Sequence, residues 1–268
     1  MPEPQQPSTP GPVLELNRVS LTFGGVRVLN GVDLAVAPGE VVALIGPNGA
    51  GKSALINCVG GVYRAEGASA IRLEGQRIEA LPAHAIARRG VMRTFQGLNL
   101  VRTLSVLDNI RLGWAARFNL GLAGTLALPW RAIAAEREAR RRAEETAELC
   151  GLSGLLATPC SELPLGVLRR VDLARALVSE PRLLLLDEPA SGLSHEERPL
   201  IGEMVRLARL RAGLSVLWVE HDLDLVLSEA QRAVVLHHGE RIAEGDPRLA
   251  SDRARIVAAY KHGRAKAA

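Results

Sequence analysis

The feature that most constrains this chain is an eight-residue segment, GPNGAGKS, that directly follows an apolar run. The run is VVALI at 41–45, and the segment extends from Gly46 to Ser53. Five consecutive apolar residues are typical of a strand that is buried on both faces of a sheet. Glycines let the backbone turn tightly, so that successive N–H groups point inward at an anion. The pattern G-x-x-x-x-G-K-S therefore predicts a phosphate-binding loop between a buried strand and a helix.

Each residue type in this loop has its own expected task. The helix that begins near Gly51 adds the positive end of its dipole. We expect Lys52 to reach the β- and γ-phosphates of a nucleotide and the Ser53 hydroxyl to coordinate Mg²⁺. The predicted nucleotide-binding residues are Gly46, Pro47, Asn48, Gly49, Ala50, Gly51, Lys52 and Ser53. The alternative is a chance glycine-rich turn, and an acidic strand end later in the chain argues against it.

Length and composition favour a globular protein of the cytosol. The 268 residues suffice for one large domain or two small ones, and 47% hydrophobic residues are ample for a core. No apolar run approaches the roughly 18 residues that a membrane helix needs, and the first residues lack the features of a secretory signal. The three scattered cysteines have no metal-ligand spacing. The net charge of +4 comes with arginine clusters that we interpret as solvated surface, so no nucleic-acid partner is expected.

The spacing of apolar residues predicts strands that alternate with helices. Strands are expected at 13–19, 32–36, 41–45, 70–74, 91–95, 183–186, 215–219 and 233–236. Helices are expected at 52–60, 105–116, 130–150, 165–180, 196–212 and 222–229. This order predicts an α/β fold with a mixed, mainly parallel sheet and an antiparallel β subdomain on the N-terminal side.

The same pattern suggests how the chain is organised into parts. We expect residues 1–12 to be a disordered, proline-rich tail and residues 13–262 to be a single domain. A helical subdomain is expected at about 97–180, inserted into the α/β core. Residues 263–268 are interpreted as a basic tail.

Acidic and polar residues stand where three of the predicted strands end. Asp187 and Glu188 follow the apolar run LLLL, and a carboxylate there can hold Mg²⁺ opposite Ser53 while its neighbour polarises a water. His221 follows another apolar strand of the same sheet, and Gln96 follows a third. Because strand ends of an α/β sheet gather around ligands, we expect these side chains to meet. The alternative interpretation of Asp187 and Glu188 is that an acidic pair before proline only begins a turn.

Together these segments resemble the ATP-binding subunits of ABC transporters. The resemblance extends from about residue 13 to residue 260. Within this group, the chain most resembles the longer ATPase subunit of branched-chain amino acid importers. The segments that carry it are FGGVRVLNGVDLAV, GPNGAGKS, RRGVMRTFQGLNLVRTLSVLDNI, LLLLDEP, VEHD and the ending IVAAYKHG. Urea and amide importers use similar ATPases and remain an alternative.

The resemblance implies roles for individual residues. Phe23 is implied to stack on adenine, and Gln96 to couple the nucleotide and its Mg²⁺ to the helical subdomain and the membrane partner. Asp187 is implied to be the Mg²⁺ carboxylate and Glu188 the general base. His221 is implied to be the histidine that contacts the γ-phosphate and helps position the water.

The resemblance also implies partners and a location. ATP and Mg²⁺ are the implied ligands. The implied assembly contains a second ABC ATPase subunit, two transmembrane permease subunits and a periplasmic or extracellular solute-binding protein. This chain would then lie peripherally on the cytoplasmic side of the cell membrane and hydrolyse ATP to power import. A soluble ABC ATPase of repair or translation is a rival, although such proteins usually carry two cassettes or long insertions.

One segment departs from the family pattern. The place of the usual LSGGQ or LSYGQ signature holds Leu163-Pro164-Leu165-Gly166-Val167, while the following RRVDLARALV matches well. Pro164 has neither a hydroxyl nor an N–H group with which to bind phosphate. Because the family's sites are composite, with one subunit's loop facing the other's signature, a homodimer would have two damaged sites. We therefore expect a heterodimer with one weak composite site, or else a non-hydrolysing regulatory subunit.

Overall fold

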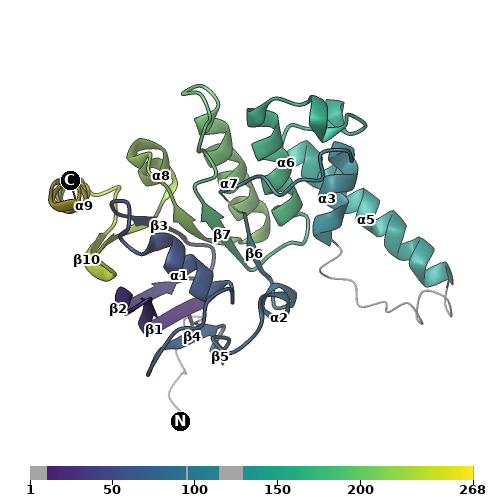
Figure 1. The fold of residues 1–268 in the computed structure, drawn as a ribbon. Helices are drawn as coiled ribbons and strands as arrows, with labels where there is room; N and C mark the ends of the chain where they lie inside the picture. The colour runs from purple at the N-terminus through teal and green to yellow at the C-terminus, as the bar shows by residue number, and fades with distance from the viewer. Residues whose placement is uncertain (1–10, 95, 115–128, 268) are drawn as a thin grey trace, which may run out of the picture.

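The computed structural model describes residues 11–94, 96–114 and 129–267 (Figure 1). Within these residues the chain forms a four-stranded antiparallel sheet in the order β2-β1-β4-β5 and a six-stranded sheet in the order β10-β9-β3-β8-β7-β6. The first sheet consists of β1 (Leu14–Phe23), β2 (Val26–Val36), β4 (Ala70–Leu73) and β5 (Gln76–Arg77). The second consists of β3 (Val41–Ile45), β6 (Val91–Arg93), β7 (Leu183–Asp187), β8 (Ser215–Val219), β9 (Arg232–His237) and β10 (Glu240–Gly245).

The six-stranded sheet is parallel except for its last strand. β3 pairs in parallel with both β8 and β9, and β7 pairs in parallel with both β6 and β8, whereas β10 runs antiparallel to β9. Val219 at the end of β8 is paired with Leu44 on one side and Asp187 on the other. The carboxyl ends of β3, β8 and β7 therefore meet at one edge, where an α/β sheet binds its ligands.

The central strands divide two hydrophobic cores. Val41, Ala43 and Ile45 of β3 belong to one core, and the alternate residues Val42 and Leu44 belong to the other. Because successive strand residues point to opposite faces, a strand between two cores must be apolar throughout. This explains why β3, β7 and β8 are buried along their whole length.

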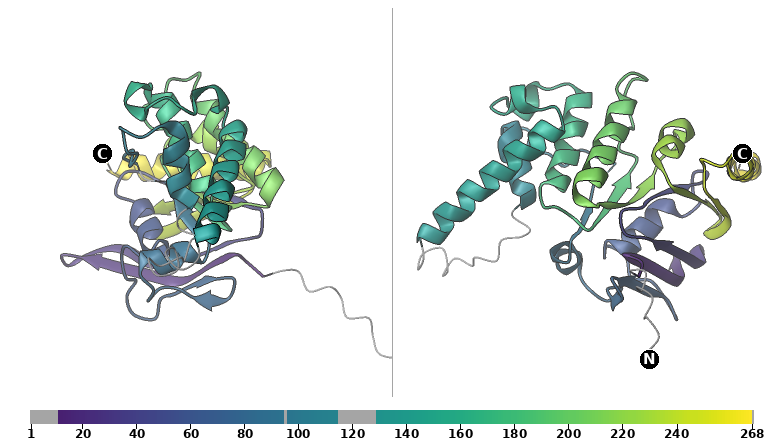
Figure 2. Two further views of the ribbon diagram at one scale, coloured as in Figure 1. Left: turned by 90° about the vertical axis from the view of Figure 1, so that its right-hand side faces the viewer. Right: turned by 180° about the vertical axis from the view of Figure 1, so that it is seen from behind.

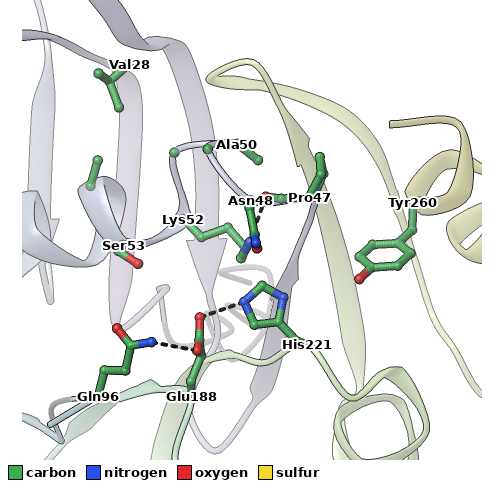
Figure 3. A pocket seen from close by; sticks show the side chains of 13 residues that line it. Val28, Pro47, Asn48, Ala50, Lys52, Ser53, Gln96, Glu188, His221 and Tyr260 are labelled. Atoms are coloured by element: carbon green, nitrogen blue, oxygen red, sulfur yellow. Dashed lines mark hydrogen bonds and ion pairs between the residues drawn. The ribbon is translucent and has the colours of Figure 1, made fainter. Parts of the chain in front are cut away.

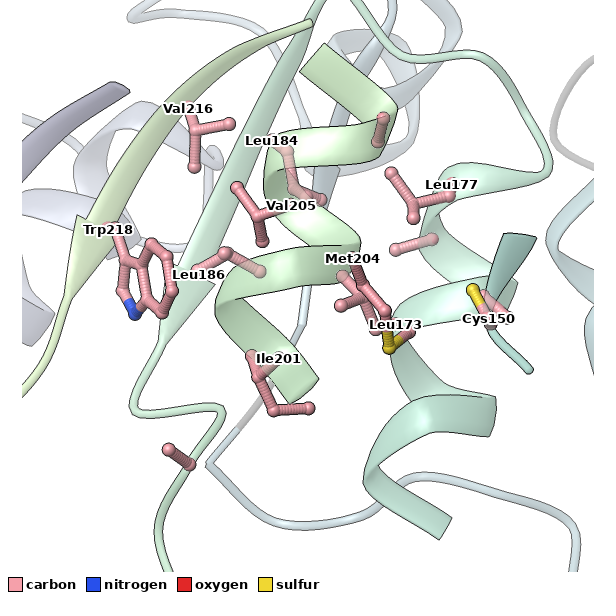
Figure 4. Close-up of a cluster of buried hydrophobic side chains, with 14 of the residues drawn as sticks. Cys150, Leu173, Leu177, Leu184, Leu186, Ile201, Met204, Val205, Val216 and Trp218 are labelled. Carbon is pink, nitrogen blue, oxygen red and sulfur yellow. The ribbon is translucent and has the colours of Figure 1, made fainter. Parts of the chain in front are cut away.

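Helices cover both faces of this sheet (Figures 1 and 2). They are α1 (Lys52–Val59), α2 (Ala83–Arg88), α3 (Val106–Trp114), α5 (Pro129–Leu149), α6 (Leu165–Leu177), α7 (Arg198–Ala212), α8 (Leu223–Glu229) and α9 (Ala250–Ala267), with short 3₁₀ turns at Ser153–Leu155 and Cys160–Glu162. In the core beside α7, sheet residues pack against the helix: Leu184, Leu186, Val216 and Trp218 lie near Ile201, Met204 and Val205 (Figure 4). α3, α5 and α6 pack on one another at the end of the molecule away from α9 (Figure 1).

Most of the predicted elements are present, and several differences have physical causes. β1 and β2 are longer than expected because Gly24 and Gly25, both with positive φ, join them in a continuous hairpin. The strand at β5 and the helices α2 and α9 were not predicted, since none carries a strong apolar period. α9 continues through the expected boundary at residue 262, so residues 263–267 end a helix. Most of the expected tail 1–12 and Phe95 lie outside the described residues.

Candidate nucleotide-binding site

The phosphate-binding loop has its shape because its glycines have no side chains. Gly51 has a φ of 99°, and a Cβ atom there would lie 2.8 Å from the carbonyl oxygen of Val28. A Cβ atom on Gly46 would lie 2.3 Å from the carbonyl oxygen of Leu236. Any larger residue would therefore push the loop away from β2 or from β9. Gly49 also has a positive φ, of 78°, which favours glycine at the tip of the loop.

The loop leads directly into α1, whose first turn is open to an anion. Gly51 is the N-cap residue in the left-handed conformation, and no side chain caps the helix. The first N–H groups of a helix lack intrahelical acceptors, and the helix dipole adds partial positive charge. A phosphate at this position would satisfy these donors.

Lys52 lies at the base of the same loop and is only 5% exposed. Its Nζ donates to the carbonyl oxygens of Gly46, at 2.8 Å, and of Pro47, at 3.0 Å. Burial lowers the pKa of Lys52, and the charges of Glu188 and Asp187 partly oppose that effect. The ammonium group is therefore held by loop carbonyls next to the place where phosphate would bind.

The loop opens into a cavity of about 920 Å³, large enough for a nucleoside triphosphate (Figure 3). Seven of the eight predicted loop residues line it, and Gly46 does not. The lining residues are Val28, Pro47, Asn48, Gly49, Ala50, Gly51, Lys52, Ser53, Ala54, Gln96, Glu188, His221 and Tyr260. The structure thus brings the loop together with polar residues that follow three separate strands.

Glu188 stands at the centre of these polar residues. Its Oε1 lies 2.7 Å from Nε2 of His221, and its Oε2 accepts a hydrogen bond of 3.1 Å from Nε2 of Gln96 (Figure 3). Glu188 has a φ of 51°, a left-handed conformation that is unfavourable for a residue with a side chain. Strain of this kind, of the order of 1–3 kcal/mol, is typical of functional sites. The turn directs the carboxylate of Glu188 into the cavity.

Asp187 occupies a different position from its neighbour. Its side chain is nearly buried, does not line the cavity, and forms an ion pair of 2.8 Å with Nη2 of Arg93. Arg93 also donates to Asn57 of α1. Of the three predicted Mg²⁺ ligands, Ser53 and Gln96 line the cavity. The carboxylate of Asp187 does not line it and is paired with Arg93. Oxygen donors of these types suit Mg²⁺.

Phe23, like Gly46 and Asp187, does not line the cavity. Its side chain is 48% exposed at the end of β1, and its ring packs edge-on against Tyr63 with ring centroids 4.8 Å apart. Val28 lines the cavity instead, as does Tyr260. Neither residue was assigned a role from the sequence, although both lie in segments that carry the family resemblance, FGGVRVLNGVDLAV and IVAAYKHG.

The degenerate signature segment begins α6, and none of its residues lines the cavity. Pro164 is the N-cap residue and provides no side-chain cap. Gly166 is buried, and a Cβ atom there would collide with the carboxylate of Glu197, at 2.1 Å from Oε1. The phosphate loop and the signature segment are thus separate surfaces of this chain.

Comparison with known proteins identifies the family. A family model described as "ABC transporter" matches residues 29–191. The chain belongs to the ABC transporter ATP-binding family. It is 37% identical to the high-affinity branched-chain amino acid transport ATP-binding protein BraF of Pseudomonas aeruginosa, over 93% of this chain and 97% of that protein. It is 36% identical to LivG of Escherichia coli K12, which has the same description, with the same coverage.

Solved structures of ABC cassettes share the fold. A nucleotide-free ATP-binding cassette from an ABC transporter aligns with a TM-score of 0.79 and 28% identity, over 92% of this chain and 96% of that one. The ADP conformation of MJ1267 aligns with a TM-score of 0.78 and 28% identity, over 93% and 98%. The predicted fold and ABC ATPase class are therefore confirmed. In the part of this ABC ATPase that the structure describes, no helix has the length and apolar character of a membrane span.

Proposed function

We propose that this ABC ATPase binds and hydrolyses ATP to power import of branched-chain or related amino acids. The observation that carries the proposal is the meeting of the phosphate loop with Gln96, Glu188 and His221 around one cavity. The names of BraF and LivG support the class of solute. The ATPase does not itself contact the solute, so a urea or amide importer differs from this proposal only in its partner chains.

The site residues divide the work of phosphoryl transfer. The loop N–H groups and Lys52 would hold the phosphates, and Ser53 with Gln96 and Asp187 would hold Mg²⁺, which neutralises developing charge on the phosphates when bound. Asp187 would face the ion directly or through water, since Arg93 holds its carboxylate. Glu188 would accept the proton of the attacking water, and His221 would orient that carboxylate and contact the γ-phosphate. Phe23 would contact adenine only if the β1–β2 hairpin closes over the base.

The proposed assembly is a heterodimer on the cytoplasmic face of the membrane. One composite site would join this chain's Lys52 and Glu188 to the ordinary signature of a second ABC ATPase subunit. The other would join the partner's loop to Leu163–Val167 of this chain. Two permease subunits and a solute-binding protein would complete the importer, with Gln96 linking the nucleotide to the helical subdomain and the membrane partner.

Two features of the second composite site support slow hydrolysis there. Pro164 offers no hydroxyl and no N–H group. A charge-assisted hydrogen bond is worth roughly 1.5–3 kcal/mol, so its loss weakens the closed dimer by about tenfold to a hundredfold. Glu197 places a negative charge against Gly166 in the first turn of α6, where a phosphate would otherwise be attracted.

The decisive measurement is ATP binding and turnover by the purified chain, alone and with an ABC ATPase subunit that has an ordinary signature. We expect the chain alone to bind MgATP with little turnover and the mixture to hydrolyse ATP. Strong, cooperative turnover by the chain alone would contradict the heterodimer. Absence of nucleotide binding would contradict the proposed function as a whole.

A further inference from the structure

The nucleotide cavity has a wall that comes from α9, the last helix of the fold. Tyr260 of α9 lines the cavity together with the phosphate loop, and its ring extends from the helix toward that loop (Figure 3). The side chain is 7% exposed, and its hydroxyl makes no hydrogen bond to any residue that the structure describes. Buried tyrosines usually place the hydroxyl on a partner. The Tyr260 hydroxyl is itself open to the cavity, so a ligand bound there can be that partner.

α9 packs against the phosphate loop around Tyr260. A Cβ atom on Gly263, one turn after Tyr260, would lie 3.4 Å from Cδ of Pro47, so the helix backbone packs on the loop itself. Ile256, one turn earlier, is fully buried. The Tyr260 ring is therefore held at a defined distance from the phosphate loop.

The position of Tyr260 along the cavity selects the part of the nucleotide that it meets. Val28 lies at one end of the loop, and Tyr260 lies at the other, beyond Pro47 (Figure 3). His221 stands between Glu188 and Tyr260 in this view, so Tyr260 is on the side of the proposed hydrolytic residues. This is the end at which the terminal phosphate would be attacked.

We propose that Tyr260 is a γ-phosphate-sensing residue whose hydroxyl donates a hydrogen bond to the terminal phosphate of bound ATP. The inference rests on the proposed function, because it requires a nucleotide in this cavity. A diphosphate would not reach Tyr260, whereas a triphosphate would satisfy its hydroxyl. The contact therefore makes the site discriminate between ATP and ADP. A hydrogen bond to a charged phosphate corresponds to about tenfold or more in affinity.

The test compares Tyr260→Phe with the wild-type chain by isothermal titration calorimetry. The probes are MgADP and the magnesium complex of adenylyl imidodiphosphate, a triphosphate analogue that is not hydrolysed. The substitution removes one oxygen atom and leaves the packed ring in place, so a matching thermal unfolding curve verifies the fold. The chain has only one other tyrosine, Tyr63, which packs on Phe23 and is absent from the cavity lining. Tyr63→Phe is therefore the matched control.

We expect Tyr260→Phe to weaken binding of the triphosphate analogue about tenfold and to leave the Kd of MgADP unchanged. Tyr63→Phe should leave the ratio of the two Kd values as in the wild type. Equal Kd ratios in wild type and Tyr260→Phe would overturn the inference while the proposed function stands. If the wild-type chain binds neither nucleotide, the proposed function itself fails.

Discussion

Nε2 of His221 lies 2.7 Å from Oε1 of Glu188, and the two residues follow adjacent parallel strands, β8 and β7. The Glu188 N–H group also donates to the carbonyl oxygen of Val219, at 2.9 Å, which ties the turn after β7 to the end of β8. The imidazole is therefore placed to orient the carboxylate. Hydrolysis is expected to depend on this pair as a unit.

The first prediction concerns this pair in the assembled complex. Glu188→Gln removes the proton acceptor and keeps the side-chain shape, so turnover should fall by about 10²–10⁴-fold while ATP binding persists. Glu196→Gln is a control, since Glu196 is exposed and absent from the cavity lining. Steady-state ATPase assays and nucleotide titration measure the two effects. Unchanged turnover in Glu188→Gln would favour a non-hydrolysing regulatory subunit.

The second prediction restores the signature. The double substitution Pro164→Ser and Val167→Gln returns a hydroxyl and an amide to the start of α6, and ATP-dependent association of the lone chain should strengthen about tenfold to a hundredfold. Pro82 is also the N-cap residue of a helix, α2, with similar backbone angles. Pro82→Ser is therefore the matched control. Analytical ultracentrifugation with MgATP measures the association, and equal gains in both variants would exclude a specific role for the segment.

The third prediction concerns pH. Glu220 is 3% exposed, and burial raises its pKa from 4.5 to about 7, although the backbone N–H groups of His221 and Ala190 oppose this shift. The folded state holds this proton more tightly than the unfolded state. The contribution of Glu220 to the free energy of unfolding is therefore largest below pH 4.5. It is lost as the pH rises through about 7, and the total loss is about 3 kcal/mol.

Glu220→Gln should remove that loss, because glutamine cannot ionise and its carbonyl oxygen can still accept from Ala190. Urea unfolding at a series of pH values from 5 to about 8 measures the difference between the two proteins. The stability of the variant relative to the wild type should increase with pH. A constant difference would show that Glu220 titrates normally.

The fourth prediction concerns the packing of α3 on α6. Gly113 lies inside α3, where alanine would ordinarily be more stable by about 1 kcal/mol. A Cβ atom there would lie 1.8 Å from the carbonyl oxygen of Arg175, so Gly113→Ala should instead destabilise by about 1–3 kcal/mol.

Gly202 inside α7 offers a matched control for this effect. A Cβ atom at Gly202 would meet only the flexible side chain of Glu229, at 3.1 Å. Gly202→Ala should therefore be neutral or stabilising, so its urea midpoint should stay the same or rise, while the urea midpoint of Gly113→Ala falls. Equal shifts would mean that α3 and α6 separate easily.

Local patterns were sufficient for the backbone of the site. The continuous apolar runs of β3 and β7 predicted strands buried on both faces, and GPNGAGKS predicted a turn that only glycine permits at Gly46 and Gly51. The polar residues at strand ends were expected to meet because parallel strands end at one edge. Gln96, Glu188 and His221 do meet there. The family followed from the same segments and is confirmed by the comparisons.

Contacts between distant parts of the chain were decided only by the tertiary structure. The sequence could not show that Arg93 holds Asp187, that Glu197 fills the space beside Gly166, or that Tyr260 reaches the cavity. The physical reason is that strand and turn propensities act between near neighbours in sequence. The packing of α9 on the loop and of α7 beside α6 depends instead on the shape and volume of side chains that lie far apart in the sequence.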